Sequence, residues 1–129
     1  MRRNITIKTL LLLSLFVTGA AWAEWREVDK TDSFTFYIDL ATLRKEDNLR
    51  KIWLLANATQ RSVTGSISTL SKYEYDCKND RYRSLAFSAY SEPMATGKMI
   101  DSINGEPTVW REIVPESSGY LVSKIVCAR

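Results

Sequence analysis

The sequence predicts an α+β domain built on one antiparallel β-sheet and ending in a short helix. Apolar and polar residues alternate over residues 33–40 and 67–77, and this period of two is typical of strands with one buried face. A polar turn at residues 78–80 leads from the second of these segments into a return strand over residues 81–90. Short polar connections join the strands, so we expect a meander of about five to six strands.

The N-terminus has the features of a secretory signal peptide. Basic residues precede an apolar run over residues 10–16, and the tripeptide at residues 21–23 fits the small-x-small cleavage pattern. We therefore expect a signal peptide over residues 1–23 and a mature domain over residues 24–129. An uncleaved membrane anchor is disfavoured, because the apolar run is shorter than the roughly 20 residues of a transmembrane helix.

The net charge gives no support for a nucleic-acid partner. The chain has 18 Lys and Arg residues against 15 Asp and Glu residues, a formal net charge of +3. Arg2, Arg3 and Lys8 supply this whole excess, so the predicted mature domain is close to neutral. We predict no binding to nucleic acid or to anionic membranes, and no integral membrane span after signal cleavage.

Cys77 and Cys127 are the only cysteines of the chain. An even pair of cysteines in an exported protein favours a disulfide, because export places thiols in an oxidising compartment. The bridge would close a loop of about 51 residues and stabilise the domain by about 4 kcal/mol in the chain-entropy model. No cysteine follows the apolar run as a lipid-anchor signal would require. We expect the domain in the periplasm, in the medium or at the cell surface.

No catalytic, metal or cofactor site is predicted. The chain has no histidine, which excludes Ser–His–Asp and Cys–His catalysis and His-containing zinc sites. Glu74 and Asp76 share a strand face at a separation of about 7 Å, which a glycosidase-type pair could use, but we expect them to be ordinary solvated surface carboxylates. The domain is therefore predicted to be non-enzymatic and to use no cofactor.

Charged side chains on the 67–90 hairpin are the candidates for surface recognition. They are Lys72, Glu74, Asp76, Lys78, Arg81 and Arg83. The basic members could hold a sulfated polysaccharide or an acidic partner, although solvated charges at a strand edge have the same pattern. The tryptophans Trp25, Trp53 and Trp110 suit carbohydrate stacking, but in a small domain we expect them in the core.

The remaining N-terminal segments are assigned from composition. Residues 24–29 are predicted as a short edge strand, and residues 49–58 as a strand that is covered on both faces at its centre. Residues 41–48 contain a charge cluster that suits an exposed connector, and residues 59–66 form a polar loop.

Three features of the C-terminal half are less determined. Two sets of residues with opposite parity compete for the buried face of strand 81–90, so its register stays open. A short strand is placed around residues 98–102, and the segment 109–114 is apolar enough to dock on the sheet. Residues 118–127 have apolar residues at helical spacing after a serine cap, with a final strand as the alternative.

An ordered set of short pieces extends over nearly the whole mature chain. The pieces are Glu24-Trp25, Tyr37-Ile38-Asp39, Trp53, Tyr73-Glu74-Tyr75-Asp76-Cys77, Arg81-Tyr82-Arg83, Tyr90-Ser91 with Met94 and Gly97, and Trp110 with Pro115 and Cys127. In this order they resemble the surface-adhesin protein E family of bacterial exported proteins. The resemblance implies a single curved antiparallel sheet, with the C-terminal helix lying against one face and fixed by a Cys77–Cys127 disulfide.

The same resemblance implies a non-enzymatic adhesive role towards host extracellular-matrix or serum proteins. It supplies no binding motif that can be transferred residue by residue. The partner is expected to be a protein or glycan of unknown identity, and assembly as a homodimer is left open. The alternative function is a soluble periplasmic inhibitor or small-ligand-binding protein.

Overall fold

The computed structural model describes residues 23–105 and 107–128. Its elements are β1 (Arg26–Lys30), β2 (Phe34–Ile38), a 3₁₀ turn η1 (Leu40–Thr42), β3 (Arg44–Glu46), β4 (Leu49–Ala58), β5 (Ser68–Asp76), β6 (Arg81–Glu92), β7 (Thr96–Asn104), β8 (Arg111–Glu112) and α1 (Ser118–Val126). The predicted signal peptide, apart from Ala23, lies outside the described residues.

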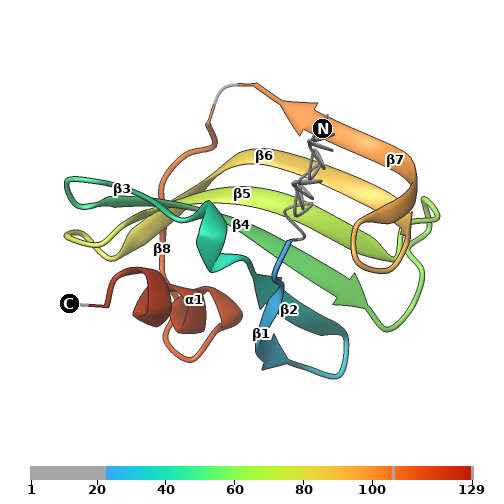
Figure 1. The fold of residues 1–129 in the computed structure, drawn as a ribbon, viewed down its shortest axis with the longest axis horizontal. Helices are drawn as coiled ribbons and strands as arrows, with labels where there is room; N and C mark the ends of the chain where they lie inside the picture. The colour runs from blue at the N-terminus through green and yellow to red at the C-terminus, as the bar shows by residue number, and fades with distance from the viewer. Residues whose placement is uncertain (1–22, 106, 129) are drawn as a thin grey trace, which may run out of the picture.

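The strands form one antiparallel sheet in the order β1-β2-β4-β5-β6-β7, with β3 beside β4 and β8 beside β6. The sheet curls like half a barrel around α1 (Figure 1). We call the face that α1 covers the inner face and the opposite one the outer face. This arrangement confirms the curved antiparallel sheet with a C-terminal helix.

The predicted number of five to six strands was wrong, because the described residues form eight. The connector predicted over residues 41–48 contains η1 and β3, and β3 pairs with the start of β4 through a tight turn at Asp47 (φ 51°). β8 is a pair of residues alongside the start of β6. Strands of two or three polar residues are too short to show an alternating pattern.

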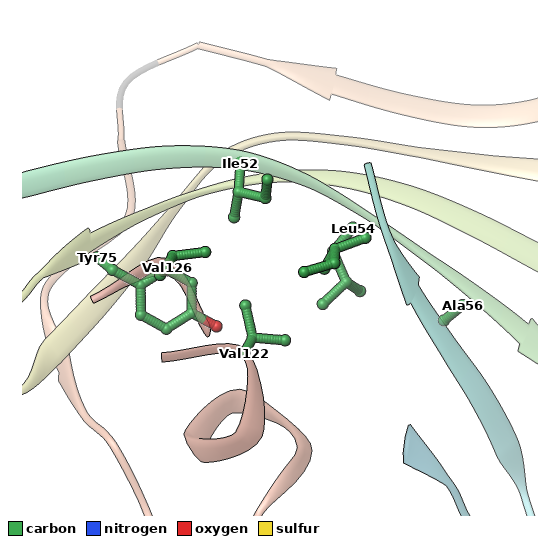
Figure 2. Close-up of a cluster of buried hydrophobic side chains, with 7 residues drawn as sticks. Ile52, Leu54, Ala56, Tyr75, Val122 and Val126 are labelled. Carbon is green, nitrogen blue, oxygen red and sulfur yellow. The ribbon is translucent and has the colours of Figure 1, made fainter. Parts of the chain in front are cut away.

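An apolar layer between the sheet and α1 forms the core (Figure 2). Its buried members are Ile38, Ile52, Leu54, Ala56, Tyr75, Val122 and Val126. The core residues of β4 are two positions apart in sequence, and the two core residues of α1 are four positions apart. Each spacing places side chains on one face of its element, and these two faces meet in the core. Ser117 is the N-cap of the helix, and its Oγ accepts a hydrogen bond from the Tyr120 N–H at 3.2 Å. The helix prediction is confirmed over the alternative strand.

The tryptophans predicted for the core are only partly buried and do not belong to this layer. Trp53 is out of phase with Ile52 and Leu54 on β4, so its indole lies on the outer face. Trp25 precedes β1 and Trp110 precedes β8. The buried members of the core are aliphatic side chains and Tyr75 instead, with Phe36, Tyr73 and Tyr82 packed against them.

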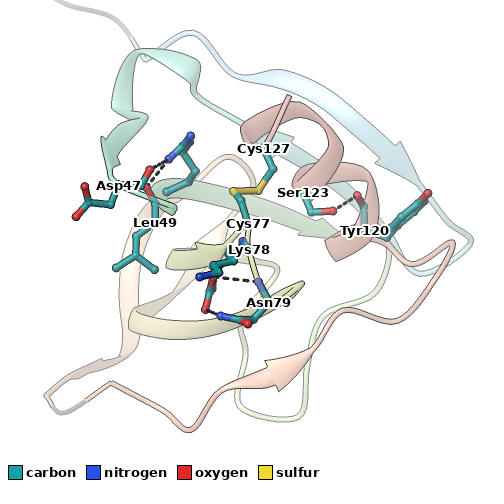
Figure 3. The surroundings of a disulfide bond; sticks show 10 residues. Asp47, Leu49, Cys77, Lys78, Asn79, Tyr120, Ser123 and Cys127 are labelled. Carbon is teal, nitrogen blue, oxygen red and sulfur yellow. Dashed lines mark hydrogen bonds between the residues drawn. A yellow bond between two sulfur atoms is a disulfide. The ribbon is translucent and has the colours of Figure 1, made fainter. Parts of the chain in front are cut away.

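A disulfide joins Cys77 to Cys127, with 5.6 Å between the two Cα atoms (Figure 3). Cys77 follows β5 directly and Cys127 is the residue after α1, so the bridge ties the end of the helix to the hairpin. The predicted bridge is confirmed.

A bulge in β6 explains why the sequence left the register of this strand open. Lys72 is opposite Ala86, but the next residue, Tyr73, is opposite Ser84, which leaves Leu85 as the extra residue. Tyr82 therefore lies on the inner face before the bulge, and Phe87 lies there after it. Both competing residue sets are correct, each for one half of the strand.

Both edges of the sheet are irregular. β1 has a register shift between Glu27 and Asp29, and the Asp29 Oδ2 accepts a hydrogen bond from the Ser118 Oγ of α1 at 2.8 Å. The pairing of β7 with β6 shifts twice within nine residues. Irregular edges resist the addition of a further strand. The faces of the sheet are therefore the better surfaces for recognition.

Candidate recognition surface

The outer face is partly covered at one end by the turn between β6 and β7. The Asn57 Oδ1 accepts a hydrogen bond from the Met94 N–H at 2.8 Å, and the Ser68 Oγ accepts one from the Ala95 N–H at 3.0 Å. Ser68 is buried on this face, as is Leu55, which does not belong to the core layer under α1. The turn therefore shields a small second buried region and leaves the rest of the outer face for the charged residues.

Two carboxylates lie buried on the outer face near the other end of β5. Glu74 is 3% exposed and Asp76 is 5% exposed, so the prediction of solvated surface carboxylates was wrong. The register of the hairpin places Arg83 opposite Glu74 and Arg81 opposite Asp76. Directly opposed side chains of opposite charge attract each other, and the longer arginine side chains lie across the shorter acids.

Each arginine is fixed to its carboxylate. The Arg83 Nε donates to the Glu74 Oε1 at 2.8 Å, and its Nη2 lies 2.6 Å from the same oxygen. The Arg81 Nε donates to the Asp76 Oδ2 at 2.9 Å. The side chains of Arg81 and Arg83 stay 40% and 28% exposed. The positive charge is thus at the surface while the negative charge is beneath it.

Asp76 also organises the turn that follows β5. Its Oδ1 accepts hydrogen bonds from the backbone N–H groups of Lys78 and Asn79, and its Oδ2 accepts one from the Asn79 Nδ2. The Asn79 side chain, followed by Arg81 and the two backbone N–H groups, lowers the pKa of Asp76 to about 2, against an opposing effect of burial. Asp76 is therefore a carboxylate at neutral pH, and a proton-donating role in catalysis does not suit it.

Trp110 completes this group. The guanidinium carbon of Arg83 lies 4.2 Å from the centre of the indole ring, and that of Arg81 lies 4.7 Å from it. Distances of this size allow cation–π attraction. We call Glu74, Asp76, Arg81, Arg83 and Trp110 the arginine–tryptophan cluster.

The structure brings together four of the six residues that the sequence singled out. Lys72 lies farther along β5, with its Nζ 5.8 Å from the centre of the Trp53 ring. Lys78 is exposed in the turn, where its backbone rather than its ammonium group bonds to Asp76.

The sequence did not predict that two further residues lie beside these charged side chains. The Nζ of Lys51 on β4 lies 4.0 Å from the Glu74 Oε2. Trp110 lies in the segment before β8 and contacts Arg83. A signal for Lys51 existed, because antiparallel pairing of β4 with β5 would place a cation opposite Glu74. No local pattern places Trp110 against residues 81–83.

The inner face has an open groove at the end away from α1. It has a volume of about 570 Å³, with Phe34, Ala56, Ala58 and Thr69 on the sheet side and residues 59–62 of the β4–β5 loop beside them. This volume lies in the range of small-molecule sites.

Within residues 23–105 and 107–128, none of the helices has the length and apolar composition that a membrane span needs. In the same ranges, no group of three or more Cys, Asp and Glu side chains is arranged to hold a metal ion.

Comparison with known proteins gives a consistent result. A family model described as surface-adhesin protein E matches residues 25–128. Crystal form II of Haemophilus influenzae protein E is similar in fold, with a TM-score of 0.63 and 14% sequence identity over 84% of this chain and 97% of that one. Protein E from non-typeable Haemophilus influenzae has a TM-score of 0.64 and 13% identity over 85% of this chain and 79% of that one.

No curated protein sequence has a significant match to the chain. At 13–14% identity, the likeness to the solved structures establishes the fold alone. The family model spans the sheet, both cysteines and α1, and it confirms the resemblance that the sequence predicted. The chain belongs to the surface-adhesin protein E family.

Proposed function

We propose that this protein is an exported, non-enzymatic binding protein that docks an acidic segment of a protein partner on the arginine–tryptophan cluster. The observation that carries the proposal is the pair of partly exposed arginines, each fixed by a buried carboxylate and by Trp110. Family membership suggests an adhesin-type role and a protein partner.

The cluster is suited to binding because its cations are already ordered. Holding a long side chain in one geometry costs conformational entropy, and a partner that meets a fixed arginine avoids most of that cost. Arginine and tryptophan are also the residues enriched where binding energy concentrates in protein interfaces. The bonds to Glu74 use the Nε and Nη2 of Arg83, and the bond to Asp76 uses the Nε of Arg81, so the other terminal nitrogens can meet carboxylates of a partner.

Export is part of the proposal. A cleaved signal peptide over residues 1–23 and a mature domain over residues 24–129 would deliver the protein to the periplasm or the cell surface. The disulfide is consistent with an oxidising compartment.

The test uses the protein exported and purified from its host, added to a panel of immobilised extracellular-matrix and serum proteins. The informative variant is E74Q/D76N/R81Q/R83Q, which removes both signs of charge together and so leaves no unpaired buried charge. The control is Lys98→Gln, which neutralises an exposed cation on β7, outside the cluster.

We expect the protein and the control to bind one or more members of the panel and the cluster variant to bind at least tenfold more weakly. Affinity should also fall as ionic strength rises, because the exposed part of the contact is electrostatic. If the cluster variant bound as tightly as the unchanged protein, the arginine–tryptophan cluster would not be the docking site. Failure to bind any member, together with confinement to the periplasm in intact cells, would reject the adhesive role.

The inner-face groove favours a second candidate function, a small-ligand-binding protein of the periplasm. Native mass spectrometry of the purified protein would show a bound small molecule in this case, and Ala58→Trp, which fills the groove, would remove it. A spectrum with only the mass of the polypeptide would count against this alternative.

A further inference from the structure

A hollow of the outer face lies beside Trp53. It has a volume of about 430 Å³ and lies between η1 and the paired strands β4 and β5. It is lined by Ala23, Asp39, Ala41, Thr42, Arg44, Trp53 and Lys72, and all but Ala23 belong to the proposed mature domain. This volume is within the range of small-molecule sites.

The wall formed by η1 is fixed in place. The Asp39 Oδ1 accepts a hydrogen bond from the Ala41 N–H at 3.0 Å, which caps η1. The Thr42 Oγ1 donates to the Asp39 carbonyl at 2.6 Å and accepts from the Trp53 N–H at 3.2 Å. A short element is thereby anchored to β4, so the hollow has a defined shape.

The hollow contains a buried carboxylate. Asp39 is only 5% exposed, yet it lines the hollow. Among the described residues, its Oδ1 accepts the hydrogen bond from the Ala41 N–H and its Oδ2 has no hydrogen-bond donor.

Two cations and an aromatic ring face the same space. The Lys72 Nζ lies 5.8 Å from the centre of the Trp53 ring. The Arg44 Nη1 donates to the carbonyls of Ala41 and Leu43, both at 3.0 Å, which holds one end of an exposed guanidinium against η1. The set of groups is thus an indole, an ammonium, a guanidinium and one carboxylate acceptor.

We infer that this hollow binds a carboxylated pyranose, that is, an acidic sugar residue of a glycan. The sugar carboxylate would pair with Arg44 and Lys72, the apolar face of the ring would pack on Trp53, and a hydroxyl would donate to Asp39. An acidic peptide would use the two cations but neither the indole face nor the Asp39 acceptor. The inference uses residues outside the arginine–tryptophan cluster and stands apart from the proposed function.

The test measures binding of methyl glucuronoside and methyl sialoside, with methyl glucoside as the neutral comparison, by saturation-transfer NMR and tryptophan fluorescence on the full exported protein. We expect at least one acidic sugar to bind saturably and the glucoside about tenfold more weakly or not at all. Arg44→Gln and Lys72→Gln should each weaken acidic-sugar binding about tenfold, the loss expected for one charged hydrogen bond.

Lys98→Gln and E74Q/D76N/R81Q/R83Q serve as controls and should leave acidic-sugar binding unchanged, which separates this inference from the protein-docking proposal. No binding of either acidic sugar at tens of millimolar would overturn the inference, since such weak affinity would carry no recognition. If methyl glucoside bound as tightly as the acidic sugars, the inference that the ligand is an acidic sugar would be overturned. Unchanged binding by both Arg44→Gln and Lys72→Gln would overturn the location.

Discussion

The two faces of β5 bury their side chains by different means. On the inner face, Tyr75 is 1% exposed because apolar side chains of the sheet and of α1 pack around it, and a disulfide holds α1 in place. On the outer face, Glu74 is 3% exposed because Arg83 from the neighbouring strand lies over it, with Trp110 against that arginine. Burial by apolar packing gives stability, whereas burial beneath partly exposed cations also leaves charge at the surface. The inner face therefore suits stability, and the outer face suits the recognition that we propose.

The largest effect on stability should come from the disulfide of the inner face. Replacing both cysteines in C77A/C127A should lower the free energy of unfolding by about 4 kcal/mol, because the unfolded chain regains the freedom of a loop of about 50 residues. Urea unfolding followed by circular dichroism measures this. Lys51→Gln on the outer face should change stability by less than about 1 kcal/mol. If C77A/C127A lost no more unfolding free energy than Lys51→Gln, the disulfide would not have the stabilising role that we assign to it.

The Glu74–Arg83 pair of the outer face should have the next largest effect. Arg83→Gln leaves the Glu74 carboxylate buried with a weaker partner and should cost about 2 kcal/mol, below the 3–5 kcal/mol for fully buried pairs because Arg83 is partly exposed. E74Q/R83Q should recover most of the loss, since neither group is then charged. Additive losses for Glu74→Gln and Arg83→Gln in this cycle would show that the two side chains are not coupled.

Acid should weaken the outer face through Asp76. Its pKa in the folded protein is about 2, below the ordinary 3.8, so its contribution to stability is complete above pH 3.8 and is lost as the pH falls towards 2. Asp76→Asn removes this titration, and the unfolding free energy of the variant should fall less steeply over that pH interval. Parallel pH profiles for the two proteins would contradict the assignment.

The smallest effect concerns the turn that covers the far end of the outer face. Met94 and Ala95 have φ values of 60° and 56°, a region that non-glycine residues adopt at a cost. Ala95→Gly should raise the free energy of unfolding by up to about 1 kcal/mol, because glycine adopts this conformation freely. Gly97→Ala is the matched opposite, since at φ 77° a Cβ would lie 2.5 Å from the Ser91 Oγ. A destabilised Ala95→Gly protein would show that the turn is unstrained.

The inner face was predictable from sequence and the outer face was predictable only in part. Alternation in β2 and β5, helical spacing in α1 and the single cysteine pair each depend on residues close in sequence or on a unique pairing. These signals gave the sheet, the helix and the tether. The bulge at Leu85 broke the parity of β6, so the pairing of Arg83 with Glu74 could not be derived.

The burial of the outer-face carboxylates required knowledge of distant segments. Glu74 and Asp76 have the alternating pattern of solvated residues, and they are covered because Arg81 and Arg83 lie opposite and Trp110 returns beside β6. Trp110 is brought there by a two-residue strand that has no pattern of its own. Local periodicity reports which side a residue faces, but it does not report what else packs on that side.

Recognition by the outer face can be tested by NMR of the ¹⁵N-labelled protein titrated with a short glutamate-rich peptide. We expect the largest shifts at the guanidinium N–H groups of Arg81 and Arg83 and at the indole N–H of Trp110, and these shifts should shrink as salt is added. Shifts centred on α1 or on the inner-face groove, or no shifts at low ionic strength, would contradict recognition by the outer face.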